Sequence, residues 1–138
     1  MSVNTKPIGV AYEDQNIIGA DKLYSANELG FTADAQGTVT QLTSKTTAVT
    51  LNKSAGTITM HNASLATATN ATFTLNNNLI SANDIIILTL AGGQATPGSY
   101  NVFANALAAG SVSISLRNIS GGSLSEAVVV NFALIHCQ

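Results

Sequence analysis

The chain has 138 residues, which is enough for one domain or for one domain with an arm, and its net charge is −2. Only 9% of the residues are charged, and 16 Thr, 13 Ser and 14 Asn supply most of the polarity. This composition excludes a helical bundle, a coiled coil and a charged disordered chain. It favours an all-β protein, because Thr forms strands while Ser and Asn form turns.

The charge balance and the apolar runs disfavour two kinds of partner. Five Lys and Arg against seven Asp and Glu give no basic patch, so we expect no nucleic-acid partner. No apolar run approaches the roughly 20 residues of a membrane-spanning helix, so we expect no membrane partner. The first residues lack a secretory pattern, and the single Cys137 has no partner for an internal disulfide. These features predict synthesis in a reducing cytoplasm.

The first 36 residues differ from the rest in charge, because they carry seven of the twelve charged side chains. This shift predicts an N-terminal arm over 1–36 and a folded domain over 37–138. Within the arm, residues 21–29 are predicted to form a short helix, with Asp21 as N-cap and Gly30 as stop. Isolated apolar residues predict that the arm docks onto a partner, with a frayed terminus as the alternative. The predicted docking residues are Tyr12, Ile17, Ile18 and Tyr24.

From residue 37 onward the sequence is typical of short β-strands. Apolar and polar residues alternate with a period of two, and turn residues recur at short intervals. Eight such strands predict an antiparallel β-sandwich, and a jelly roll in particular. The predicted strands are 38–42, 47–51, 57–61, 70–75, 84–90, 99–104, 111–118 and 126–137.

The alternation also predicts which side chains face the core. The residues expected to be buried are Phe73, Ile114, Leu116, Val130 and Phe132. Strands 84–90 and 126–137 are apolar on both faces, and a second apolar face in a sandwich requires a cover. We expect this cover to be another copy of the chain, with the arm as the alternative. The predicted interface residues are Ile86, Leu88, Val129, Asn131, Ala133 and Ile135.

Few residues suggest catalysis. His136 and Cys137 are adjacent in a predicted strand, so their side chains point to opposite faces and do not form a nucleophile–base pair. His61 has no His or Cys at metal-ligand spacing, and most of the acidic residues lie in the arm. We therefore predict no enzyme activity, no metal and no cofactor.

Several segments resemble small structural proteins of tailed bacteriophages. They are GTVTQ at 37–41, AVTLNK at 48–53, GTITM at 56–60 and the stretch 114–128, with ADKL at 20–23 and ELGF at 28–31. The resemblance covers most of 20–138. It implies a capsid decoration (cement) or head-fibre protein that is synthesised in the host cytoplasm and forms a homotrimer on the outer surface of the virion head. Its partner would be the major capsid protein. The first 19 residues match the family less clearly, so the resemblance leaves open whether they grip the capsid.

The alternative function is a head-fibre module that binds a receptor or a glycan. Such a module uses exposed aromatic rings, and the predicted sandwich contains Phe73, Tyr100, Phe103 and Phe132. Tyr100, close to the Pro97 turn, is predicted to be the exposed ring.

Overall fold

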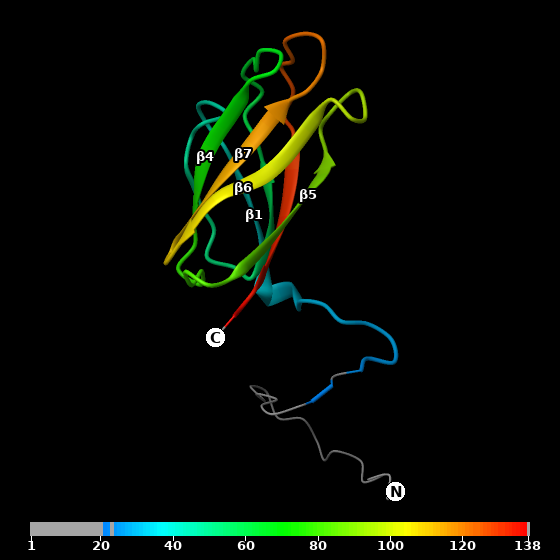
Figure 1. Cartoon of the computed structure of the whole chain (residues 1–138), viewed down its shortest axis with the longest axis vertical. Coiled ribbons are helices and arrows are strands. Elements are labelled where there is room, and N and C mark those ends of the chain that lie inside the picture. Colours follow the sequence, from blue (N-terminus) through cyan, green and yellow to red (C-terminus); the bar gives the residue numbers. More distant parts are fainter. Residues whose placement is uncertain (1–20, 23, 138) are drawn as a thin grey trace, which may run out of the picture. The chain divides into compact units, whose positions relative to one another are not determined.

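A computed structural model describes residues 21–22 and 24–137, and the chain divides into two units, Met1–Gly30 and Phe31–Gln138. The second unit holds eight strands and one 3₁₀ helix, η1 (Figure 1). Their bounds are η1 Ala33–Ala35, β1 Gln36–Thr40, β2 Val49–Thr50, β3 Ala55–Thr59, β4 Asn70–Asn76, β5 Ile85–Gly92, β6 Tyr100–Ala108, β7 Ser111–Asn118 and β8 Val129–Ile135.

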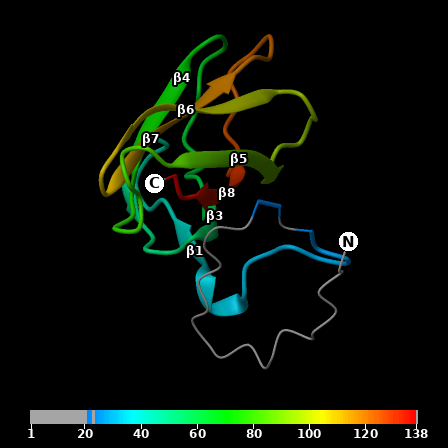
Figure 2. The ribbon, with the colours of Figure 1, turned by 60° about the horizontal axis from the view of Figure 1, so that its bottom comes forward.

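The eight strands form two packed sheets, which confirms the predicted all-β sandwich. The first sheet has the order β1-β3-β8-β5 and the second has the order β2-β4-β7-β6, and Figure 2 shows the two layers. The chain passes from one sheet to the other at every connection except the β6–β7 hairpin.

Both sheets are mixed, although the sequence predicted antiparallel strands throughout. β1 pairs with β3 in parallel, and β2 pairs with β4 in parallel. The cause is the repeated crossing between the sheets. Two successive reversals return the chain to its first direction, so β3 runs like β1 and β4 runs like β2. The other strand pairs are antiparallel.

The predicted short helix over residues 21–29 is wrong, because the described residues of that segment contain no helix. The Ser25 hydroxyl donates to the carbonyl of Glu28 at 2.8 Å and lies 3.4 Å from the backbone N–H of Asn27. Such local bonds from a Ser side chain compete with helical backbone bonds. A short helical turn is found further along the chain instead, at η1, which lies immediately before β1.

The core lies between the sheets, and all five residues predicted to be buried are buried. Two glycines make room for core side chains at one place, where Gly37 of β1 pairs with Gly56 of β3. A Cβ on Gly56 would lie 2.7 Å from the Gly37 carbonyl oxygen and 2.7 Å from the Leu51 side chain. The two glycines therefore leave the space into which Leu51 and the Phe132 ring pack.

The first prediction concerns this core. Phe132→Ala should reduce the free energy of unfolding by about 3–5 kcal/mol, because the ring is 3% exposed and its loss leaves a cavity. Ser113→Ala is the control and should change the free energy by less than about 0.5 kcal/mol, since Ser113 lies on the outer face of β7. Urea unfolding measures both variants. Equal stability of Phe132→Ala and the parent would contradict this assignment of the core.

Candidate functional site

Three exposed isoleucines form an apolar patch on the outer face of the first sheet. Ile85 and Ile87 lie on β5, and Ile135 lies on β8 directly opposite Ile85. Their side chains are 53%, 47% and 48% exposed, respectively. β5 is an edge strand, so the patch also lies beside unpaired backbone groups. We call Ile85, Ile87 and Ile135 the isoleucine patch.

The predicted interface residues divide between the two faces of the first sheet. Val129, Asn131, Ala133 and Ile135 alternate with the buried residues of β8 and therefore lie on the outer face. Ile86 and Leu88 are different, because they pack against the core. The prediction chose the wrong face of β5, and Ile85 and Ile87 point outward in their place.

A polar band crosses the same outer face beside the isoleucine patch. Thr38, Thr57, Asn131 and Thr89 occupy one row across the four strands. The Thr57 hydroxyl donates to the Asn131 Oδ1 at 2.8 Å. The outer face of the first sheet therefore combines an apolar end with a hydrogen-bonding centre, which is the usual mixture at a protein interface.

The predicted docking residues lie in the first unit of the chain. Tyr12, Ile17 and Ile18 are outside the described residues. Tyr24 is described, and its side chain is 82% exposed. An exposed tyrosine of this kind is available to a partner.

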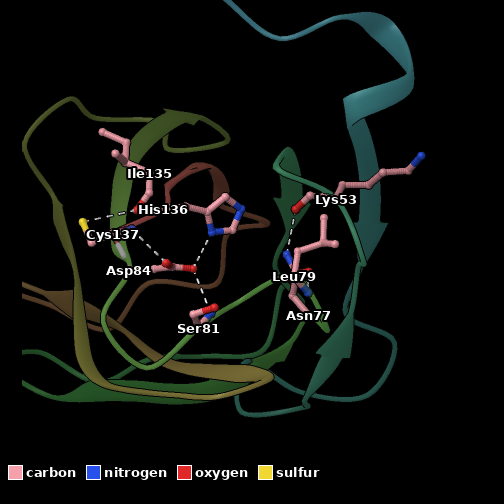
Figure 3. A network of polar contacts seen from close by, with 8 residues as sticks. All are labelled: Lys53, Asn77, Leu79, Ser81, Asp84, Ile135, His136 and Cys137. Atoms are coloured by element: carbon pink, nitrogen blue, oxygen red, sulfur yellow. Dashed lines mark hydrogen bonds and ion pairs between the residues drawn. The ribbon is translucent and has the colours of Figure 1, made fainter. Parts of the chain in front are cut away.

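A hydrogen-bond network joins the end of β8 to the turn before β5 (Figure 3). Asp84 Oδ2 accepts the Ser81 N–H at 2.8 Å and lies 2.8 Å from His136 Nδ1, while Asp84 Oδ1 accepts the Cys137 N–H at 3.2 Å. The Asp84 side chain is fully covered, whereas the His136 side chain is 50% exposed. The Cys137 thiol lies 3.9 Å from the carbonyl of Ile135, its only hydrogen-bond partner among the described residues. The network fixes the chain beyond β8.

The charge state of Asp84 follows from these contacts. The hydrogen bond from the Ser81 N–H is the main cause that lowers the pKa of Asp84, burial opposes it, and the contacts with Cys137 and His136 lower the pKa further. The ionised carboxylate is therefore the form that the folded chain stabilises.

Lys45 is a second buried charge, which sequence analysis did not single out. It is 3% exposed, and its ammonium donates to the carbonyls of His61 and Glu126, each at 2.5 Å. Burial lowers the pKa of Lys45, and the nearby Glu126 partly restores it. The side chain thus ties the β1–β2 loop to the ends of two other loops.

Tyr100 is buried, so the prediction that it is the exposed ring is wrong. It is 4% exposed, and burial beside the Glu126 carboxylate raises the pKa of its hydroxyl strongly. The hydroxyl and Glu126 Oε2 are close, although neither has a well-formed hydrogen bond in the described part of the chain. Glu126 Oε1 accepts the Ala95 N–H at 2.7 Å.

Phe103 is the ring that faces outward. It pairs with Ser115 of β7, which in turn pairs with Thr72 of β4, and all three lie on the outer face of the second sheet. Phe103 is partly exposed, whereas Phe73, Tyr100 and Phe132 are buried. The alternation along β6 could have identified Phe103 as an outward-facing ring. Val102 before it points inward, and Ala104 after it is small.

Residues 21–22 and 24–137 contain no group of three or more His, Cys, Asp and Glu that could hold a metal ion. The same residues contain no helix long and apolar enough to cross a membrane. Comparisons with known protein families, curated proteins and solved structures found no match.

The second prediction concerns Asp84 and pH. The folded-state pKa lies below the unfolded value, so the carboxylate stabilises the fold above about pH 4 and loses this effect as the pH falls through the folded-state pKa. Asp84→Asn should lower the melting temperature at neutral pH, and its difference from the parent should shrink as the pH falls below about 4. Melting curves by circular dichroism measure this. Asp34→Asn, which removes an exposed carboxyl, is the control. A difference in melting temperature between Asp84→Asn and the parent that stays the same at every pH would contradict the prediction.

Proposed function

We propose that this chain is a capsid decoration protein, which forms a homotrimer on the outer surface of a phage head and stabilises the shell. The isoleucine patch is the observation that carries the proposal, because exposed apolar side chains grouped on one face of a sheet indicate an assembly surface. The sequence resemblance to phage structural proteins supports the class. A structural role also agrees with the contacts of His136 and Cys137, which bind these residues to Asp84 in the turn before β5.

Association of copies through the first sheet explains its surface chemistry. The isoleucine patch supplies apolar area, and the polar band of Thr38, Thr57, Thr89 and Asn131 supplies donors and acceptors. A stable contact buries about 800 Å² on each partner. A closed ring of copies hides such a face without growing into a fibre, and the family resemblance favours three copies.

The third prediction tests this interface. Ile87→Lys should convert the trimer to a monomer at micromolar concentration, because it places a charge within the isoleucine patch. Ile119→Lys is the matched control, since Ile119 is 53% exposed in the β7–β8 loop, away from the first sheet. Light scattering measures the mass of each variant. A parent chain that is monomeric, or a trimer that tolerates Ile87→Lys, would contradict the interface, and a dimer would contradict the threefold part.

The boundary of the arm sets the design of the next test. Asp34 accepts a hydrogen bond from Lys53 at 2.7 Å through its carbonyl, and Gln36 begins β1. Removal of all of 1–36 would therefore damage the sandwich. Removal of residues 1–30 leaves the compact unit that begins at Phe31.

The fourth prediction concerns the arm and the capsid. The full chain should bind heads that lack it, and purified virions should contain it in a fixed ratio to the major capsid protein. A chain without residues 1–30 should remain a folded trimer and lose binding to the heads, because the arm carries the docking residues. Co-sedimentation with heads measures binding. Full binding by the shortened chain would contradict the role of the arm, and absence from virions would contradict the proposed function itself.

A further inference from the structure

We propose that the outer face of the second sheet binds a glycan that carries a carboxylate. In this site the sugar ring lies on Phe103 and the carboxylate is held by Arg117. The inference does not rest on the proposed role in capsid assembly, because assembly uses the other sheet. It replaces the glycan site predicted at Tyr100, which is buried.

The ring and the guanidinium lie close together on this face. Arg117 of β7 pairs with Asn101 of β6, and Phe103 is the next residue along β6 whose side chain lies on the same side. Diagonal neighbours of this kind are about 7–8 Å apart, so one sugar residue with its substituent can contact both. β4, β7 and β6 lie side by side at the front of Figure 1.

Hydrogen bonds join the polar groups that neighbour Phe103 on this face. Ser115 is 1% exposed, and its Oγ lies 2.6 Å from the Thr72 hydroxyl and accepts the Asn105 amide at 2.6 Å. Asn105 is the extra residue of a β-bulge in β6, which brings its side chain to Ser115. These hydrogen bonds are made within the sheet and do not involve the Phe103 ring. The exposed part of the ring is therefore free to contact a ligand.

Arg117 supplies the charge complementarity. Its Nη1 donates to Asn70 Oδ1 at 3.1 Å, and no carboxylate of the described residues lies within ion-pair distance. The remaining guanidinium N–H groups can therefore bind a carboxylate in the bidentate manner that arginine favours. Asn70 and Asn101 flank Arg117 on both neighbouring strands, and amides of this kind pair with sugar hydroxyls.

The neutral surroundings favour a glycan over a nucleic acid. The other side chains of this face are Ser, Thr and Asn, with small alanines on β6, so Arg117 is its one charge among the described residues. Nucleic-acid grooves neutralise several phosphates and carry many basic groups. A single guanidinium beside one ring fits a sparsely charged chain of hydroxylated rings.

The fifth prediction tests the site with defined polymers. In affinity electrophoresis, polygalacturonate or hyaluronan should retard the full chain relative to a gel without polymer, while neutral dextran should not. Phe103→Ala and Arg117→Gln should each weaken the apparent affinity about tenfold or more, because each removes one of the two main contacts. Lys22→Gln controls for the change in net charge and should bind as the parent does.

Several results would overturn the site. Retention by neither carboxylated polymer would do so, as would retention that survives both Phe103→Ala and Arg117→Gln in chains with unchanged circular dichroism. An equal loss in Lys22→Gln would show a general effect of charge. Tighter binding of a single-stranded oligonucleotide, lost in the same two variants, would assign the face to nucleic acid instead. Ile87→Lys leaves Phe103 and Arg117 in place, so its monomer should still be retarded by the carboxylated polymers and lose only the contribution of multivalency. The failure of the assembly interface and the failure of this site are therefore distinguishable.

Discussion

The buried Lys45 ammonium is the contact on which one end of the sandwich depends. It binds the carbonyls that follow β3 and precede β8, while Gln41 binds the backbone of the loop that carries Lys45. A charge taken out of water is tolerated only where hydrogen bonds replace its solvation. The chain crosses between the sheets at almost every connection, so most loops are not closed by the backbone hydrogen bonds of a hairpin. Hydrogen bonds from side-chain donors hold these loops instead.

Buried asparagine amides hold other loops in the same way, and they explain part of the high asparagine content. Asn118 is fully buried and donates to the carbonyls of Leu65 and Gly122, which joins two loops. Asn77 is 1% exposed and donates to the carbonyl of Lys53. A side-chain amide can satisfy a loop backbone without the desolvation cost of a charge. An Asn-rich, weakly charged sequence is therefore compatible with a sandwich whose connections are long.

The sequence predicted those strands best in which polar and apolar residues alternate. Phe73 and Ile114 have polar neighbours, so the pattern alone places them in the core. β5 has no such alternation, because Ile85 to Leu88 are all apolar. Only the pairing with β8 shows that Leu88, opposite Phe132, faces the core and that Ile87 faces outward. The parallel strand pairs and the buried charge of Lys45 depend on how the chain crosses between sheets, which local pattern does not contain.

The two outer faces of the sandwich differ in chemistry, and the two proposals assign one task to each face. The first sheet presents the isoleucine patch and a threonine-rich band, a surface suited to other copies of the same chain. The second sheet presents hydroxyls and amides around Phe103 and Arg117, a surface suited to a hydrated ligand. Because the sheets form opposite layers, an assembly built through the first leaves the second accessible. Repetition of a weak glycan site around a trimer would then raise the apparent affinity without any new contact.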